Sequence, residues 1–550
     1  GISLELRVSG ASVEKIYTLE PGADVSRVRM RMDGARSIQV AGDRSLVART
    51  GIGEIRMSAP IAYQVAGGRR KSVSVRYRTD GRVYGFALGA YDHRLPVVID
   101  PLLQSTYLGG SATEDFVSLA VHPTSHDVYV AGWTFSADFP GTTGGAQPSL
   151  GESSHEDAFV ARLDASLSTL LQASYFGGTG SDRGYALAVH PGTGDVYVAG
   201  LTASTDLAGT AGGSQPASAG NTDGFVARFN AELTVLRQAT YLGGSDSDEV
   251  ASIAIDPVSG QVYVAGDTSS SNFPRTAGGA QTVRGGGLDV YVARLNANLT
   301  ALAQSTYLGG MGDLELGYAL AISPVSGDVY VAGVTNSPNF PGTAGGAQPA
   351  AGGVLDGYVA RFNANLTTLA GSTYLGGSGV DIAVGLAIHP TTGEVYTVGR
   401  TDSTAFPGTA GGAQPIAGGS GDGYVTRLNA SLSTILQSTY LGGSDNDFCR
   451  VVVVDASTVY VGGGTSSTGF PHSGGGAQPT NGGATDAFIA RLNTALTAGG
   501  QATYLGGSGV EFASGLALRP ASGELYVAGR TESTNFPHTS GGARSAPAGG

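Results

Sequence analysis

The stretch STYLGG stands at residues 105–110, and six near-copies of it follow along the chain. A repeat of nearly fixed period over some 450 residues indicates one repetitive architecture, not several unrelated domains. The tyrosines of the seven copies lie 64 to 68 residues apart, at Tyr107, Tyr175, Tyr241, Tyr307, Tyr374, Tyr440 and Tyr504.

Each repeat contains four short runs typical of β-strands. In the second repeat these runs are GYALAVHP (184–191), DVYVAGLT (195–202), DGFVARFN (223–230) and LTVLRQATYLGG (233–244). Short polar turns separate the first run from the second and the third from the fourth. Each repeat is therefore predicted to form one four-stranded antiparallel sheet.

Both faces of such a sheet are apolar. In DVYVAG, Val196 and Val198 face one way, while Tyr197 and Ala199 face the other. A sheet of this kind must be covered on both sides. The first run alternates large and small residues, as in Leu187-Ala188-Val189, which suits a crowded innermost strand. We therefore predict an all-β fold, a seven-bladed β-propeller of four-stranded antiparallel blades. A β-solenoid is the less favoured alternative, because its strands are parallel.

The predicted ring closes by joining the two ends of the repeat region, so that the propeller covers residues 101–550. PLLQSTYLGG (101–110) supplies a fourth strand, while the seventh repeat reaches its second strand, GELYVAGRT (523–531). By spacing, the third strand of that blade falls just beyond Gly550. Either the chain continues there, the favoured interpretation, or another chain donates the strand.

Composition limits the classes of function. Glycine supplies 89 of 550 residues and 41% are hydrophobic, which indicates a turn-rich β protein and not a disordered one. The net charge of −13 with scattered basic residues argues against nucleic-acid binding, and no apolar run reaches the ~18 residues of a membrane span. The single Cys449 excludes a disulfide framework.

Residue 1 reads like the middle of a β-domain, so we expect upstream sequence, which leaves a signal peptide and export open.

Several motifs carry a resemblance to a known family. STYLGG, the following SGxD, VYVAGxTxS and FPGTAGGAQP resemble the bacterial SBBP repeat of secreted and surface β-propellers. Residues 1–100, with GFALGAYDHRLPVVIDP at 85–101, are similar to the uncharacterised β-rich domain that often precedes these repeats. The resemblance implies an extracellular or cell-surface location and supplies no catalytic residue.

The first candidate site is an acidic residue that follows LGG in every repeat. Seven carboxylates around one axis could hold a cation such as calcium or repel anions at the channel mouth. Alternatively, each caps its own turn by accepting backbone N–H groups. The residues are Glu114, Asp182, Asp248, Glu315, Asp381, Asp447 and Glu511.

The second candidate site is the residue after VAG or its equivalent, which varies inside a fixed framework. Such variation is typical of a recognition surface, and equally of an unconstrained exposed site. The candidate binding face comprises Trp133, Leu201, Asp267, Val334, Arg400 and Arg530, with Gly464 at the same position of the sixth repeat.

Other recurring residues are interpreted as structural. The loop phenylalanines such as Phe340 are expected to pack against their blades. Third-strand arginines such as Arg228, each with an Asp five residues earlier, are expected to serve in blade-to-blade packing and in ion pairing. His122, His190 and His389 lie in different repeats, which argues against a shared zinc site. We expect no metal and no cofactor.

Three functions remain open. The leading one is a secreted or cell-surface module, structural or binding, whose long-loop face meets a glycan, a matrix protein or another copy of itself. The second is an extracellular polysaccharide-active hydrolase or lyase that uses channel-mouth carboxylates, although no catalytic motif is visible. The third is a filament or matrix subunit that assembles by strand donation at the seventh blade.

Overall fold

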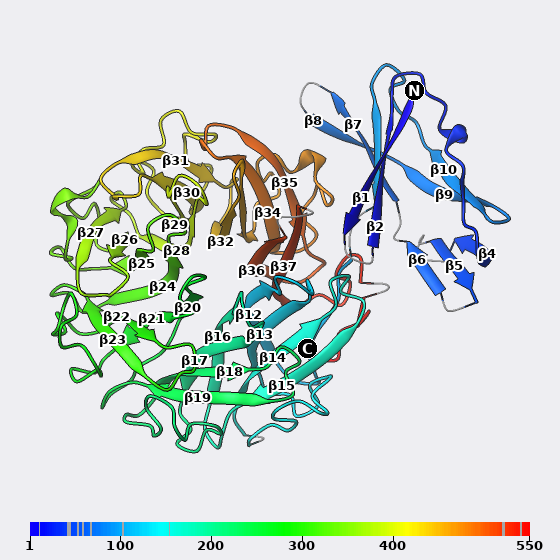
Figure 1. Ribbon diagram of the computed structural model, residues 1–550. Helices are drawn as coiled ribbons and strands as arrows, with labels where there is room; N and C mark the ends of the chain where they lie inside the picture. Colours follow the sequence, from blue (N-terminus) through cyan, green and yellow to red (C-terminus); the bar gives the residue numbers. More distant parts are fainter. Residues whose placement is uncertain are drawn as a thin grey trace.

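The computed structural model describes residues 1–9, 12–40, 46–51, 54–57, 60–66, 69–101, 104–152, 154–519, 523–539 and 542–549. These residues form β-strands and three short 3-10 helices, and no α-helix occurs among them. Figure 1 shows two parts, a small N-terminal β domain and a ring of sheets beside it. The prediction of an all-β fold is confirmed.

The N-terminal domain contains three antiparallel sheets around one core. Tyr17 and Phe86 meet edge to face with ring centroids 5.0 Å apart, and Leu46 and Ile99 are fully buried with them. The five-stranded sheet has the order β1 (Ile2–Ser9), β2 (Ser12–Leu19), β11 (Val97–Pro101), β7 (Pro60–Ala66), β8 (Arg69–Val73). The three-stranded sheets are β3 (Met30–Arg31), β10 (Val83–Leu88), β9 (Val75–Asp80) and β4 (Ala35–Val40), β5 (Leu46–Thr50), β6 (Glu54–Met57), with η1 at Val25–Arg27.

The ring contains six four-stranded antiparallel sheets, here called blades 1 to 6, in which strands follow one another in sequence order. Blade 1 is β12 (Glu114–Val121), β13 (Val128–Thr134), β14 (Asp157–Leu163), β15 (Leu170–Phe176), and blade 2 is β16 (Asp182–Val189), β17 (Val196–Thr202), β18 (Asp223–Phe229), β19 (Leu236–Leu242). Blade 3 is β20 (Ser252–Ile255), β21 (Val262–Thr268), β22 (Asp289–Leu295), β23 (Leu302–Leu308), and blade 4 is β24 (Glu315–Ile322), β25 (Val329–Thr335), β26 (Asp356–Phe362), β27 (Leu369–Leu375), with η2 at Thr343–Gly345. Blade 5 is β28 (Asp381–Ile388), β29 (Val395–Thr401), β30 (Asp422–Leu428), β31 (Ile435–Leu441), and blade 6 is β32 (Asp447–Val454), β33 (Thr458–Thr465), β34 (Asp486–Asn493), β35 (Gly499–Leu505), with η3 at Ser473–Gly475.

Each blade is buried by its neighbours on both faces, as the apolar pattern of the strands requires. In β17, Val196 and Tyr197 point to opposite faces and both are 0% exposed. First strands lie against the first strands of the next blade around the ring, and Figure 1 shows them nearest its centre. Hydroxyl groups also join the blades, since the Tyr197 hydroxyl of blade 2 donates to the Ala297 carbonyl of blade 3 at 2.6 Å.

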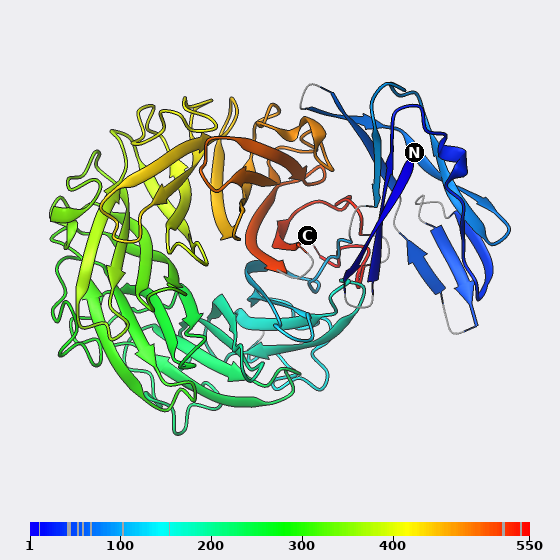
Figure 2. The same cartoon turned by 45° about the horizontal axis from the view of Figure 1, so that its top comes forward.

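A two-stranded sheet, β36 (Glu511–Arg519) and β37 (Glu524–Thr531), closes the ring against blade 1. β36 and β37 both contact β12. The Tyr526 hydroxyl donates to the Ala165 carbonyl of blade 1 at 2.9 Å, which repeats the bond made by Tyr197. Figure 2 shows the end of the chain, residues 523–539 and 542–549 in red, beside the segment that enters blade 1.

Residues 104–110 take the position of a fourth strand in this last sheet. The Tyr107 hydroxyl donates to the Ser533 carbonyl at 2.8 Å and accepts the Phe536 N–H at 2.9 Å. The same two bonds recur in the complete blades, for example at Tyr374. No third strand lies between β37 and this segment among the described residues, so the count of seven complete blades stays a prediction.

The STYLGG motif ties the fourth strand of each blade to the long connection between its second and third strands. In blade 4 the Tyr374 hydroxyl donates to the Ser337 carbonyl at 2.7 Å and accepts the Phe340 N–H at 2.9 Å. The Thr373 hydroxyl beside it accepts the N–H of Gln348 at 2.8 Å. The motif therefore recurs because every blade must hold its long connection in place.

Both glycines of the motif are required for steric reasons. A Cβ on Gly376 would lie 2.3 Å from Asp356 Oδ1 and 2.8 Å from Asp381 Oδ2. A Cβ on Gly377 would lie 2.8 Å from that of Ser403. These distances are well inside the ~3.5–4.0 Å optimum for carbon contacts.

Candidate functional site

The two ends of the ring differ in the length of their connections. The connections that follow the second strands are about 20 residues long. They emerge at the same end of the ring as the connections that follow the fourth strands. The two kinds of connection meet there in parallel bridges, such as the one between Leu355 and Val380. We call this end the long-loop face. The opposite end carries only short turns. Long connections of this kind in a compact domain are usually either functional or well packed.

The candidate acidic ring lies on this side but is buried. Asp182, Asp248, Glu315, Asp381, Asp447 and Glu511 are at most 2% exposed, and Glu114 is partly buried. In blade 2, Asp182 accepts the N–H of Gly178 at 2.8 Å and the hydroxyl of Ser204 at 2.7 Å. These contacts are the ones expected if each carboxylate caps its own turn by accepting backbone N–H groups. Burial raises the pKa of Asp182.

A second buried carboxylate faces this ring in each complete blade. It begins the third strand, at Asp157, Asp223, Asp289, Asp356, Asp422 and Asp486. In blade 1, Asp157 accepts the N–H of Gly151 at 2.8 Å, and burial raises the pKa of its carboxyl to about 7. The sequence signal was the Asp that recurs five residues before each third-strand arginine, as in DGFVARFN (223–230). Among the described residues, no group of three or more His, Cys, Asp or Glu side chains could hold a metal ion.

The structure divides the residues of the candidate binding face. Arg400 and Arg530 are exposed and pair with neighbouring acids, Arg400 with Asp402 at 3.0 Å and Arg530 with Glu532 at 2.7 Å. Trp133 and Leu201 are partly exposed. These four residues remain available to a partner.

Asp267 and Val334 do not belong to an exposed face, which corrects the sequence-based assignment. They are 6% and 2% exposed. Asp267 Oδ1 accepts the N–H of Gly317 from the next blade at 2.8 Å, so the neighbouring blade covers this position. Glu249 lies against Asp267, and burial raises the pKa of both carboxyl groups. Gly464, at the same motif position, is buried as well.

Trp133 forms part of a mixed aromatic and charged group on the long-loop face. The guanidinium of Arg183 from blade 2 lies 5.3 Å from the Trp133 ring centroid and pairs with Glu156 at 2.6 Å. Phe135 meets Trp133 edge to face at 5.8 Å and is 38% exposed. This group joins blades 1 and 2.

Sequence reasoning missed the exposed aliphatic side chains of the long-loop face. Val283 and Met311, in adjoining connections of blade 3, are 71% and 75% exposed. Val354 and Ile416 extend the series to blades 4 and 5 at 84% and 75%, with Val380 between them. The sequence carried a signal for Val283, Met311 and Ile416, because most other repeats have Ser, Thr or Ala at the positions of these three residues.

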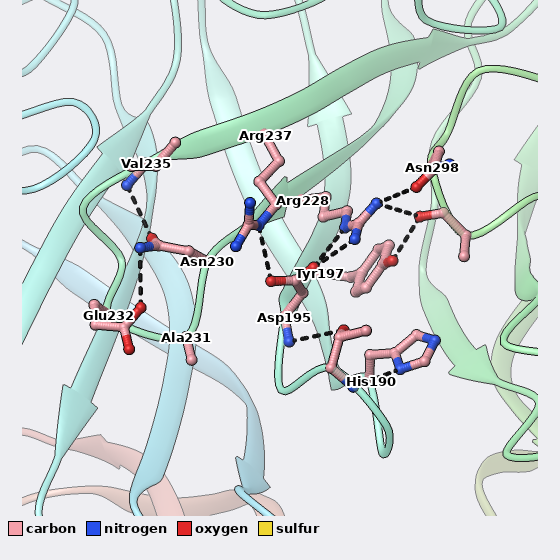
Figure 3. A network of polar contacts seen from close by, with 12 residues as sticks. His190, Asp195, Tyr197, Arg228, Asn230, Ala231, Glu232, Val235, Arg237 and Asn298 are labelled. Atoms are coloured by element: carbon pink, nitrogen blue, oxygen red, sulfur yellow. Dashed lines mark hydrogen bonds and ion pairs between the residues drawn. The ribbon is translucent and has the colours of Figure 1, made fainter.

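The opposite end of the ring carries the arginine network drawn in Figure 3. Arg228 pairs with Asp195 at 2.5 Å, and Arg237 joins the same carboxylate at 2.9 Å. Arg228 also reaches Asn298 of blade 3 at 2.5 Å. The network holds neighbouring blades together. His190 Nδ1 accepts the N–H of Gly192 within its own turn at 3.1 Å, which is the contact of a turn residue.

The fold and its faces define a β-propeller protein with one elaborated face. Residues 239–274 match the family model described as "Beta-propeller repeat", named SBBP, and residues 1–102 match "Domain of unknown function (DUF7948)". Both matches agree with the resemblance seen in the sequence motifs. No helix among the described residues has the length and apolar character to span a membrane.

Comparison with known proteins gives one distant curated relative. The chain is 27% identical over 305 residues to "Regulatory protein FlaEY" of Caulobacter vibrioides, which covers 53% of this chain and 30% of that protein. The chain therefore spans less than a third of the relative's length. Two solved structures are similar at 12% identity each. Chaetomium thermophilum Sqt1 has a TM-score of 0.39, with 78% of this chain and 96% of that chain covered, and BamB from Moraxella catarrhalis has 0.33, with 91% and 97% covered.

Proposed function

We propose that the protein is a non-catalytic binding module that engages a protein partner through its long-loop face. The observation that carries this proposal is the row of exposed aliphatic side chains on that face, Val283, Met311, Val354 and Ile416, in three successive blades. Exposed apolar patches rimmed by polar residues commonly mark protein interaction sites. The polar rim is supplied by the Ser-, Thr- and Gly-rich connections around them.

The rigid setting of these side chains supports the same proposal. The Tyr, Thr and Gln bonds of blades 2 to 6, with Ser174 in place of Thr in blade 1, hold each long connection against its blade. Loops held in this way lose little conformational entropy when they bind. Trp133 and the exposed Arg400 and Arg530 extend the proposed face, and Trp and Arg are frequent anchors at interfaces.

We further propose that the module acts outside the cell or at the bacterial cell surface. The support is the resemblance of its repeats to those of secreted and surface propellers. A polysaccharide-active enzyme has less support, because Asp182 and Asp381 are 0% exposed and hydrogen-bonded within their own blades. A general acid must reach the bond that it protonates.

Binding of fluorescently labelled protein to the surface of cells that produce it tests the proposal. Replacing Val283, Met311 and Ile416 together with Asp should reduce surface binding at least tenfold, because buried charges oppose an apolar contact. The matched control replaces Val258 and Val325, which are 94% and 58% exposed on short turns of the opposite end, with Asp. Unchanged binding of the triple variant, or an equal loss in the control, would contradict the proposal.

A further inference from the structure

The charge of the chain is divided unevenly between its two parts. Residues 1–101 carry 16 Arg and Lys side chains against 10 Asp and Glu, a formal charge of +6, whereas residues 102–550 carry 15 against 34, a formal charge of −19. We propose that exposed arginines of the N-terminal domain bind the long-loop face of a second copy of this chain. The inference rests on the proposed function, because it names the partner of that face.

The arginines concerned lie on the outer face of the sheet formed by β3, β10 and β9. Arg76 and Arg78 are two residues apart on β9 and exposed, while Tyr77 between them is 5% exposed and points into the core. The strand register places Arg31 of β3 on the same face. Arg82 is exposed in the turn between β9 and β10. We call these four arginines the basic surface.

Most of the charge on the basic surface has no partner within its own domain. Arg31 pairs with Asp33 at 2.7 Å. Arg76, Arg78 and Arg82 form no ion pair within the described part of the chain. The domain contacts the ring through β8, which meets η3 of blade 6, whereas Figure 1 shows β9 and β10 on the side away from the ring. Acidic groups that pair with these arginines therefore come from another molecule.

The long-loop face offers exposed carboxylates beside its aliphatic side chains. Asp246, Asp313 and Asp445 follow the fourth strands of blades 2, 3 and 5 and are exposed. Asp313 stands two residues after Met311, which is 75% exposed. A guanidinium group can hold a carboxylate through two parallel hydrogen bonds. The long-loop face therefore combines groups that fit arginines with an apolar contact area.

A second copy is the partner that the charges of this chain favour. The ring of one copy, at −19, attracts the +6 domain of another and steers the two together. The two surfaces differ, so the contact is head to tail and each copy offers one surface of each kind. Association can therefore continue from copy to copy. Because both surfaces are exposed to solvent, added salt should weaken the contact.

Sedimentation velocity of the full chain tests this assembly. The parent protein should associate in about 0.05 M NaCl and dissociate in about 0.5 M NaCl, because salt screens exposed charges. Arg76→Glu with Arg78→Glu should raise the dissociation constant about tenfold or more, since like charges then meet across the contact. Arg94→Glu with Arg450→Glu is the matched control, because it changes the net charge equally at exposed arginines outside the basic surface. The control should associate like the parent protein.

Mixing two variants distinguishes a specific contact from a damaged protein. Asp246→Arg with Asp313→Arg should also weaken association, because both surfaces of that variant are then basic. In an equal mixture with the Arg76→Glu, Arg78→Glu variant, association should return. Each contact between unlike variants again joins opposite charges, whereas contacts between like variants do not. Circular dichroism verifies that both variants are folded.

Two results would overturn the proposal: a parent protein that stays monomeric in low salt, and a mixture of the two variants that does not associate. Parent chains that bind polyglutamate without binding each other would also overturn it, because the basic surface would then serve an anionic polymer. The proposed function is judged separately. Loss of cell-surface binding on replacing Val283, Met311 and Ile416 would still support a protein partner if the chains did not associate.

Discussion

At the scale of single residues, the buried carboxyl groups stand out. A carboxyl group that begins a third strand and one that begins the first strand of the next blade lie on either side of one glycine, as Asp356 of blade 4 and Asp381 of blade 5 flank Gly376. Burial raises the pKa of both groups. A carboxyl removed from water holds its proton more tightly, since the charged form loses most by desolvation. The free energy of unfolding is therefore expected to depend on pH through these buried carboxyl groups.

The clearest case is Asp157, whose pKa burial raises to about 7. An unfolded Asp titrates near ~3.9, so below about pH 4 the group is protonated in both states and its contribution to stability is complete. Between these two values the unfolded chain releases a proton that the folded chain keeps. The free energy of unfolding therefore falls as pH rises from about 4 to 7, by up to ~1.4 kcal/mol per pH unit for this group.

Asp157→Asn should reduce this slope, because the amide has no proton to release in the range. Urea denaturation at several pH values between 4 and 8 measures the change. Asp313→Asn, at an exposed carboxylate on the same side of the ring, is the control and should keep the slope of the parent protein. An unchanged slope in the Asp157 variant would contradict the assignment.

At the scale of elements, the decisive bonds are those between the fourth strand and the long connection. The Tyr374 hydroxyl satisfies one buried donor and one buried acceptor, the Phe340 N–H and the Ser337 carbonyl. A buried polar group left without a partner costs about 1–3 kcal/mol. The motif tyrosine thus sets the shape of the long-loop face as well as the stability of its blade.

Tyr374→Phe should lower the free energy of unfolding by about 2 kcal/mol or more, because it leaves two buried backbone groups unsatisfied. Chemical denaturation measures the loss, and faster hydrogen exchange in residues 336–348 should accompany it. Tyr424→Phe is the matched control, since this fully buried hydroxyl has no hydrogen-bond partner among the described residues. The control should be neutral or stabilising, and equal losses in the two variants would argue against the role of the motif bonds.

The sequence alone was sufficient to predict the four-stranded blades, but it was not sufficient to predict which side chains are exposed on the long-loop face. Strand alternation and repeat period are local properties, so residues such as Val196 and Tyr197 predict a doubly covered sheet before any contact is known. Exposure at one motif position depends on the neighbouring blade. Asp267 is covered because Gly317 approaches it, whereas Arg400 at the same position is exposed. Long-range packing decided that difference.

At the scale of the whole molecule, closure is the property on which the account depends. The last sheet contacts blade 1 through the bond from Tyr526 to Ala165, and residues 104–110 return to the last sheet. An open row of blades would leave two apolar sheet faces in water. Closure covers both of these faces.

Distances between spin labels at equivalent loop positions test closure most directly. Ala137, Thr205, Thr404 and Thr534 are exposed at the same position of blades 1, 2, 5 and the last sheet, and the buried Cys449 leaves cysteines introduced there as the accessible thiols. A closed ring predicts that the Ala137–Thr534 distance equals the Ala137–Thr205 distance between adjacent blades, with Ala137–Thr404 the longest. An Ala137–Thr534 distance longer than Ala137–Thr404 would contradict the account, because the blades would then lie in an open row.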